Sequence, residues 1–413
     1  FGEGPRWRSG RLWFTDSPAG TVYSVGETGD LAAEVEVVRP SGLGWLPDGT
    51  LVVSSLFAPK VHFVDAGGTV IDTVDVSDVA WSTNDLVVTG DGRIFVDLYQ
   101  HDGTAMGGGI GLLQRNGDLR VLTTDLAVPN GLGVLPDGLT LVVNETNGSR
   151  VLAYSYLPDG GLGEQRVFAD LPGDCHPDGL CVDAEGAVWV GCYDTGEFLR
   201  VRAGGEVTHR ISVDHGWAVA PCLGGADGRT LYMAVNDTTH EGLMVGSSTG
   251  WIMQARVDVP GPVDLWAVSV HLLTSSPAER DQEAATLVQQ FNDVVPDLDY
   301  LVMGGDFNTH VRDEPALATL SARVSVSGPY PVDNDGNDFT NGNRTKPYDW
   351  VLPSPELRAV EIPVLIGDSH FDAGLVVDTR VYSPLDEISP AKDADSGASN
   401  MQHMAVVRDF ALE

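Results

Sequence analysis

The stretch Leu46-Pro47-Asp48-Gly49-Thr50-Leu51-Val52 decides the fold, because it places a tight-turn signal among apolar strand residues. Asp and Gly tolerate the positive φ angles of a short hairpin turn, so Asp-Gly between β-rich runs predicts a β-hairpin. A turn glycine in the same setting returns five more times in residues 1–258, at Gly10, Gly92, Gly138, Gly186 and Gly228. The spacing is about 40 to 48 residues, which is typical of the blades of a β-propeller. We therefore expect a mainly β protein whose residues 1–258 form a six-bladed β-propeller.

The repeat stops near residue 258, and the architecture changes beyond it. Residues 248–257 read as a last strand, and Pro260-Gly261-Pro262 predicts a linker over residues 259–264. Downstream, the pattern predicts a buried strand at 265–271, a helix at 279–294 and another buried strand at 300–303. A strand, a helix and a strand in this order indicate an α/β layer. Residues 386–399 read as a polar loop and 405–410 as a final strand.

The charge balance excludes two classes of partner. The chain has 59 acidic against 24 basic residues and a formal net charge of -35, a field that repels phosphate backbones and anionic membranes. No basic patch and no apolar run long enough for a membrane span stand out. We expect a soluble protein with a highly charged or salt-adapted surface that binds neither nucleic acid nor membrane. It could be cytoplasmic or secreted, and its oligomeric state stays open.

Four cysteines occur in the 413 residues: Cys175, Cys181, Cys192 and Cys222. This number is too small for a disulfide framework, and the spacing is not that of a metal site. We expect buried free thiols.

Polar residues recur at one position of the repeat, about seven residues before the turn glycine. They are Glu3, Asn84, Asn130 and Asp178. In a propeller the starts of the innermost strands converge on a central axis, so side chains from separate blades can meet there. Carboxylate and amide oxygens suit a hard cation such as Ca²⁺, with Zn²⁺ or Mn²⁺ as alternatives. Capping of a turn is the alternative role for each residue taken singly.

These positions resemble a known family. Glu3-Gly4-Pro5, Asn84-Asp85, Pro129-Asn130-Gly131 and Pro177-Asp178-Gly179 are similar to the senescence marker protein/gluconolactonase/luciferin-regenerating enzyme family. The resemblance implies a divalent-metal-dependent hydrolase of a lactone or related small ester, with Ca²⁺ as the first choice and Zn²⁺, Mn²⁺ or Mg²⁺ possible. By it, Glu3, Asn130 and Asp178 would hold the metal, and Asp178 would also be the general base. Asn84 would contact the metal or the substrate.

A second resemblance concerns residues 265–413. Gly304-Gly305-Asp306-Phe307-Asn308-Thr309, with His271, Asp349 and His403, is similar to the carboxy-terminal half of the endonuclease/exonuclease/phosphatase superfamily. It implies a partial α/β two-sheet sandwich and a metal-dependent phosphodiesterase or phosphatase. By it, Asp306 and Asn308 would orient water and phosphate, and His271 would contact the phosphate. Asp349 would support His403, which would be the acid/base.

Three functions therefore compete. The first is a metal-dependent lactonase, whose partner is a small-molecule lactone or ester. The second is a phosphodiesterase through residues 265–413. The third is a calcium-binding propeller without enzymatic activity. Two histidines, His176 and His240, are candidates for the mouth of the propeller tunnel.

Overall fold

The computed structural model describes residues 1–101, 106–296 and 299–411. It divides into two compact units, which we call unit 1 (Phe1–Pro262) and unit 2 (Val263–Glu413). Among the described residues, no helix has both the length and the apolar character needed to cross a bilayer.

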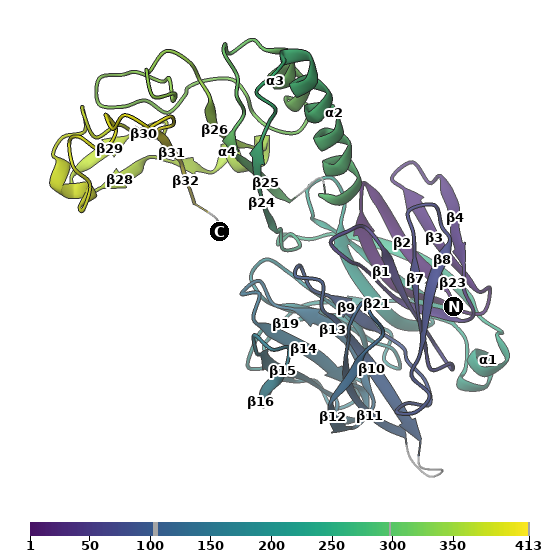
Figure 1. Ribbon diagram of the computed structural model, residues 1–413. Coiled ribbons are helices and arrows are strands. Elements are labelled where there is room, and N and C mark those ends of the chain that lie inside the picture. Colours follow the sequence, from purple (N-terminus) through teal and green to yellow (C-terminus); the bar gives the residue numbers. More distant parts are fainter. Residues whose placement is uncertain (102–105, 297–298, 412–413) are drawn as a thin grey trace. The chain divides into compact units, whose positions relative to one another are not determined.

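Unit 1 consists of six antiparallel sheets, each made of strands that follow one another in the chain (Figure 1). The first sheet contains β1 (Gly2–Arg8), β2 (Arg11–Asp16), β3 (Thr21–Gly26) and β4 (Leu31–Glu36), and the second contains β5 (Pro40–Trp45), β6 (Leu51–Ser55), β7 (Lys60–Val64) and β8 (Val70–Asp75). The third sheet contains β9 (Leu86–Val88), β10 (Ile94–His101), β11 (Met106–Leu113) and β12 (Leu119–Leu126), and the fourth contains β13 (Pro129–Val134), β14 (Thr140–Glu145), β15 (Arg150–Tyr156) and β16 (Leu162–Asp170). The fifth sheet contains β17 (Pro177–Val182), β18 (Val188–Cys192), β19 (Glu197–Val201) and β20 (Val207–Ser212), and the sixth contains β21 (Trp217–Gly224), β22 (Thr230–Asp237) and β23 (Thr249–Arg256). A short helix, α1 (His240–Val245), lies between β22 and β23 in the chain.

The first strands of the six sheets contact one another in a propeller-like ring. β1 contacts β5, β5 contacts β9, and the series continues through β13 and β17 to β21, which contacts β1. The Asn236 side chain joins the last sheet to the first, because its Oδ1 accepts from Gly2 N at 2.8 Å and its Nδ2 donates to Gly2 O at 3.0 Å. The prediction of a mainly β protein is confirmed, and six sheets occupy the span of the six predicted blades.

The Asp-Gly hairpins form as the sequence predicts. Gly49 and Gly138 have φ angles of 85° and 64°, which a residue with a Cβ rarely adopts. In the same turns, Asp48 Oδ1 accepts from Thr50 N at 2.9 Å, and Asp137 Oδ1 accepts from Leu139 N at 2.8 Å. The aspartates therefore replace backbone hydrogen bonds that the turns cannot make.

Apolar side chains pack between neighbouring sheets rather than within one. The cluster around Val61, Phe63 and Ile94 spans the second and third sheets, and the cluster around Val151, Leu180 and Val190 spans the fourth and fifth. These side chains are 0 to 2 % exposed, and each stabilises the fold by about 1.5–3 kcal/mol through burial.

The prediction of four free thiols is wrong for two of them. Cys175 and Cys192 form a disulfide with a Cα–Cα distance of 5.0 Å. The pairing of β17 with β18 places Pro177 opposite Cys192, and this register brings the chain just before β17 next to the end of β18. Cys181 and Cys222 are free, as predicted, and only Cys222 is fully buried.

Unit 2 combines one sheet with helices and several short strand pairs. Its elements are β24 (Leu265–His271), α2 (Pro277–Val294), β25 (Tyr300–Asp306), α3 (Pro315–Leu320), β26 (Asp349–Pro353), α4 (Pro355–Ala359), β27 (Glu361–Ile362), β28 (Val364–Ile366), β29 (Ser369–Phe371), β30 (Leu375–Val377), β31 (Ala405–Val407) and β32 (Asp409–Phe410). β25 is the central strand, parallel to β24 and antiparallel to β26. The predicted helix and the two predicted strands around it are confirmed.

Two details of the unit 2 prediction are wrong. The strand at 265–271 is not buried: Leu265 is 46 % exposed, because only the face of β24 that carries Trp266, Val268 and Val270 packs on the core. The expected final strand divides at Arg408 into β31 and β32, which pair with different partners, β30 and β27.

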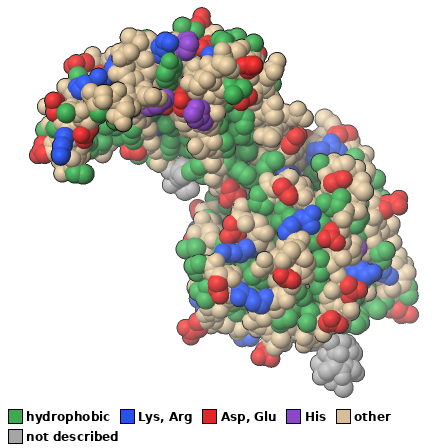
Figure 2. Space-filling view, viewed as in Figure 1, with side chains coloured by type: hydrophobic (Ala, Val, Ile, Leu, Met, Phe, Trp, Pro, Cys, Tyr) green, Lys and Arg blue, Asp and Glu red, His purple; other side chains and the backbone are tan. Residues whose placement is uncertain are grey.

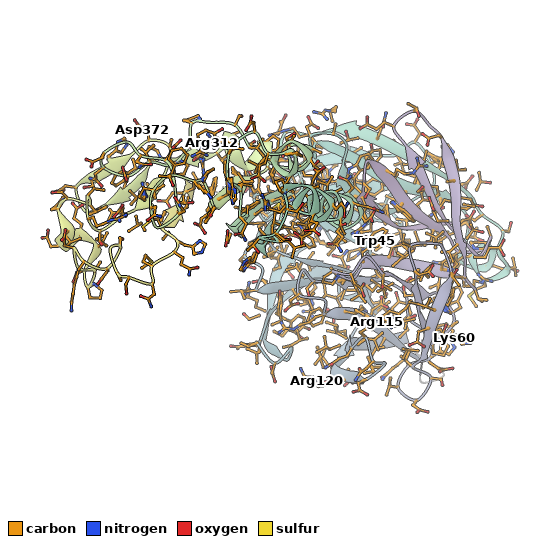
Figure 3. The ribbon with its side chains drawn as sticks, turned by 45° about the horizontal axis from the view of Figure 1, so that its top comes forward. Trp45, Lys60, Arg115, Arg120, Arg312 and Asp372 are labelled. Carbon is orange, nitrogen blue, oxygen red and sulfur yellow. A yellow bond between two sulfur atoms is a disulfide. The ribbon has the colours of Figure 1, made fainter. Side chains whose placement is uncertain are left out.

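An arginine over aromatic rings supports the loops of unit 2. The guanidinium carbon of Arg312, labelled in Figure 3, lies 3.8 Å from the Tyr330 ring centroid and 4.9 Å from that of Trp350. The Trp350 indole N–H donates to Thr309 Oγ1 at 2.8 Å. Through these contacts the segment after β25 is fixed beside the start of β26.

Candidate functional site

Two of the residues predicted to meet on the axis of unit 1 lie at irregularities in the first strands of their sheets. The register of β13 against β14 shifts between Pro129 and Leu132, and that of β17 against β18 between Pro177 and Leu180. Asn130 and Asp178 follow these prolines directly. Such a bulge interrupts the ladder and re-aims a side chain, and here it places both residues at the wall of a cavity.

The glycine after each of these residues allows the innermost strands to approach closely. A Cβ on Gly131 would lie 2.5 Å from Leu180 N, and a Cβ on Gly179 would lie 2.5 Å from the Cβ of Ala220. No side chain fits at such distances. The Asn130-Gly131 and Asp178-Gly179 pairs therefore combine one residue that faces the cavity with one that lets the next strand pack against the backbone.

One cavity of about 410 Å³ brings all four predicted residues of unit 1 together: Glu3, Asn84, Asn130 and Asp178 line it. Each is 8 % exposed or less. They come from the starts of β1, β13 and β17 and from the residues just before β9, so four separate sheets contribute to one site.

The two carboxylates of the cavity hold their protons unusually tightly. Burial raises the pKa of Asp178 to about 7, a hydrogen bond from the Asn130 amide opposes the shift, and the charge of Asp85 adds to it. The pKa of Glu3 is also raised well above its ordinary value, first by burial and then by the charges of Asp178 and Asp85. Both carboxylates lack enough positive charge nearby to compensate for their loss of water.

The amide of Asn84 is fully engaged by the protein. Its Oδ1 accepts from Ser41 Oγ at 2.7 Å, and its Nδ2 donates to Asn130 Oδ1 at 3.0 Å and to Tyr99 Oη at 3.1 Å. Through the hydrogen bond to Asn130, Asn84 orients that amide, whose Oδ1 also accepts from Gly131 N at 3.0 Å.

The sequence reasoning missed two buried acids beside the site, Asp85 and Asp97. Asp97 accepts from Asn84 N at 2.6 Å and from Asp85 N at 2.9 Å, and burial raises its pKa well above the ordinary value. Asp85 lies 3.3 Å from the guanidinium of Arg6. A single carboxylate inside the apolar run Ile94–Leu98 was the available signal, since an aspartate is almost never fully buried unless it is paired.

Aromatic residues of the cavity wall were also missed. Tyr193, Trp217 and His240 line the cavity, and their rings are mutual neighbours: the centroids of Tyr193 and Trp217 lie 5.2 Å apart and those of Trp217 and His240 4.9 Å apart. Of the two histidine candidates, His240 is at the cavity, whereas His176 pairs with Asp194 outside its lining. No local sequence pattern marks Tyr193 or Trp217, because they follow from the packing of α1 against two strand ends.

In unit 2, the structure brings Asp306, Asp349 and His403 together. One ligand atom of each lies within 4.8 Å of the others. His403 Nδ1 lies 3.1 Å from Asp349 Oδ1, and His403 Nε2 lies 3.7 Å from Asp306 Oδ2. Burial raises the pKa of Asp349, and the charge of His403 opposes this shift.

The remaining two predicted residues of unit 2 flank this group. His271 Nε2 lies 3.6 Å from Asp306 Oδ2, and its side chain is 73 % exposed. Asn308 adopts a φ of 52°, and its Nδ2 donates to Leu272 O at 2.7 Å. Asp306 ends β25, His271 ends the parallel strand β24 and Asp349 begins the antiparallel strand β26. The three residues therefore lie side by side at one end of the strands.

Comparison with known proteins identifies relatives of the first part of the chain. Residues 1–237 match the family described as SMP-30/Gluconolactonase/LRE-like region. A pentonolactonase from Haloferax volcanii is 27 % identical over 244 residues, which cover 56 % of this chain and 80 % of the relative. Regucalcin from Bos taurus is 28 % identical over 275 residues, covering 61 % of this chain and 89 % of the relative.

Solved structures agree on the fold. A calcium-binding protein, regucalcin from Agrobacterium tumefaciens, superimposes with a TM-score of 0.53 at 20 % identity, over 63 % of this chain and 91 % of its own. A luciferin-regenerating enzyme gives a TM-score of 0.53 at 18 % identity, over 63 % and 92 % of the two chains.

Proposed function

The chain belongs, through residues 1–237, to the SMP-30/gluconolactonase/LRE-like family, and from this membership we propose that unit 1 is a lactone hydrolase dependent on a divalent cation. A pentonolactonase is among its relatives. The observation that carries the proposal is the meeting of Glu3, Asn130 and Asp178 in one cavity. We further propose that residues 1–258 form a six-bladed propeller, that residues 259–264 are a linker, and that the cavity lies on the propeller axis.

The donor set fits a cation. Glu3 and Asp178 repel each other and both have raised pKa values, and no Lys or Arg is among the described residues that line the cavity. Two buried carboxylates in this state favour either protons or a positive ion. Glu3, Asn130 and Asp178 offer oxygen ligands, which suit Ca²⁺, Mg²⁺ or Mn²⁺, with Zn²⁺ as an alternative. When bound, the cation would polarise the lactone carbonyl.

The side chains divide the remaining work. Asp178 removes a proton from the attacking water, whose oxygen bonds to the carbonyl carbon. The ring C–O bond then breaks, and the proton passes to the leaving alkoxide, so that a hydroxy acid results. Asn84 orients the Asn130 amide through the 3.0 Å hydrogen bond between them.

Replacing Asp178 tests this assignment. We expect Asp178→Asn to fold and to lose at least about 100-fold in kcat on a lactone, together with the rise in Tm that divalent cations give the wild type. Asp214→Asn is the matched control, because Asp214 is an exposed acid outside the cavity lining. Unchanged turnover in Asp178→Asn would refute the assignment. Tight cation binding in a wild type that hydrolyses no lactone would instead favour the calcium-binding alternative.

A second candidate function belongs to unit 2. The approach of Asp306, Asp349 and His403 within 4.8 Å favours a metal-dependent phosphodiesterase, in which His403 is the acid/base and Asp349 supports it. Asp306 and Asn308 would orient water and phosphate, and His271 would contact the phosphate. With Mg²⁺ and bis(4-nitrophenyl) phosphate, we expect turnover that His403→Ala removes and Asp178→Asn leaves intact. Absence of turnover in the wild type would exclude this function for such diesters.

A further inference from the structure

The cavity of unit 1 has two chemically distinct parts. Its polar part comprises Glu3, Asn84, Asn130 and Asp178, together with Tyr99, Thr146, Asn147 and His240. Its other part is apolar and aromatic, and we call it the apolar wall: Leu56, Phe57, Val128, Tyr193, Trp217 and Met244. The apolar wall has no role in the chemistry proposed for Asp178, so it bears on which substrate the cavity accepts.

Two aromatic residues of the apolar wall pack with His240, and the three rings come from separate parts of the chain. Tyr193 follows β18, Trp217 begins β21, and His240 begins α1. Their rings form a closed triangle of contacts, in which Tyr193 and His240 meet edge to face with centroids 6.0 Å apart. Tyr193 and Trp217 remain partly exposed although the cavity is the space they face. Rings fixed by each other in this way present a preformed surface to a ligand.

Another part of the wall is held in place by Arg39. Its guanidinium donates to Leu243 O at 3.3 Å and to Met244 O at 3.1 Å, which fixes the end of α1. The same guanidinium lies 5.6 Å from the Phe57 ring centroid. Phe57 has a φ of 58°, a rare conformation for a bulky residue. Such a conformation persists where the surrounding structure enforces it.

Charge and polarity restrict the substituent that fits this wall. The described residues lining the cavity include no Lys or Arg, so an anionic substituent would find no such side chain to pair with there. Hydroxyl groups placed against Leu56, Val128 or Met244 would lose water without gaining a partner, which costs free energy. An apolar group gains from the same contact.

We propose that the substrate of unit 1 is a lactone or ester that carries an uncharged apolar substituent, aryl or alkyl, and that Trp217 and Met244 determine this specificity. The inference rests on the proposed lactone hydrolase and goes beyond it, since it separates this cavity from one made for polyhydroxylated lactones. A volume of about 410 Å³ is within the range of small-molecule sites.

Two substrates and three variants test the inference. Dihydrocoumarin carries an aryl group, and δ-gluconolactone carries hydroxyls. We expect the wild type to have at least about 10-fold higher kcat/KM on dihydrocoumarin. Met244→Ser and Trp217→Ser should lower kcat/KM on dihydrocoumarin by about 10-fold, mainly through KM, and change it little on δ-gluconolactone. Leu139→Ser is the matched control for Met244→Ser, because both residues are exposed, at 63 % and 54 %, and Leu139 is outside the cavity lining.

The outcomes separate the inference from the function on which it rests. Hydrolysis of δ-gluconolactone in preference to dihydrocoumarin overturns the inference and leaves the lactonase intact. If neither substrate is hydrolysed, the proposed lactonase function is wrong. The inference about the apolar wall is then tested separately, by measuring the binding of the unreactive lactam 3,4-dihydro-2-quinolinone with calorimetry. Binding that Met244→Ser weakens and Leu139→Ser does not would support the apolar wall. Absence of binding to the wild type would refute it.

Discussion

At the scale of single residues, the site of unit 1 depends on a three-residue unit that occurs twice, as Pro129-Asn130-Gly131 and Pro177-Asp178-Gly179. The first residue precedes the register shift, the second faces the cavity, and the third lets the neighbouring strand approach. The residue that faces the cavity and the glycine that allows close packing are adjacent in the chain. Replacing the glycine is therefore expected to displace the side chain in the cavity as well as to disturb the packing of the strands.

The raised pKa of Asp178 predicts a pH dependence of stability in the absence of divalent cations. A folded-state pKa of about 7 against an ordinary value of 3.8 means that the folded protein binds more protons than the unfolded chain between these values. The stabilisation is present below about pH 4 and is lost as pH rises through about 7. In excess chelator, Tm should therefore fall between about pH 5 and about pH 8.

Asp178→Asn supplies the control for this titration. The variant removes the Asp178 carboxyl and its charge next to Glu3, so the difference in Tm between it and the wild type reports the titration of this pair. We expect that difference to change with pH in the chelator, and a saturating divalent cation to raise the Tm of the wild type but not that of the variant. A Tm difference that stays constant over the whole range would show that Asp178 titrates normally.

At the scale of elements, the disulfide between Cys175 and Cys192 ties the approach of β17 to the end of β18. It closes a loop with a sequence separation of 17 residues, which corresponds to about 3 kcal/mol in the chain-entropy account. We expect the double variant Cys175→Ser/Cys192→Ser to lower the free energy of unfolding by about this amount in urea denaturation. Cys181→Ser, at a free and partly exposed thiol, should cost less.

The location of the disulfide gives a second readout. Cys175 lies three residues before Asp178 and Cys192 directly precedes Tyr193, so the double variant should also weaken cation binding. Equal stability of the double variant and the wild type under oxidising conditions would show that the two thiols do not pair in solution.

Much of the element structure followed from local chemistry. Asp-Gly turns and apolar runs predicted the hairpins and their period, because a turn residue and its neighbours act within a few positions. The exposure of one face of β24 was not predictable, since the apolar residues of Leu265–His271 would look the same in a strand that is buried on both faces. Pairing of Cys175 with Cys192 and of β31 and β32 with different partners depends on register between distant segments, which no local pattern records.

Only part of the candidate site was predictable from the sequence. Glu3, Asn84, Asn130 and Asp178 share one position of a repeat, and the repeat itself brings them together. Tyr193 and Trp217 share no such position. Their place in the cavity wall follows from how α1 packs, and it emerges only in three dimensions.

At the scale of the whole molecule, the acidic surface is the dominant property. Figure 2 shows carboxylate side chains spread over the visible faces of both units, and the formal net charge is -35. Repulsion among these charges opposes the compact state, and salt screens it. We expect Tm to rise by several degrees when NaCl increases from about 0.01 M to about 1 M. Tetramethylammonium chloride at equal ionic strength should raise the Tm by a similar amount, because the effect comes from screening. A fall in Tm with either salt would contradict the prediction.

The measurement that tests the central claim most directly is the location of a divalent cation in crystals of the whole chain soaked with Mn²⁺, by its anomalous scattering. We predict a strong peak in the cavity of unit 1, within coordination distance of oxygens of Glu3, Asn130 and Asp178, and its loss in Asp178→Asn. A peak confined to Asp306, Asp349 and His403, or none in the cavity at saturating Mn²⁺, would contradict the account.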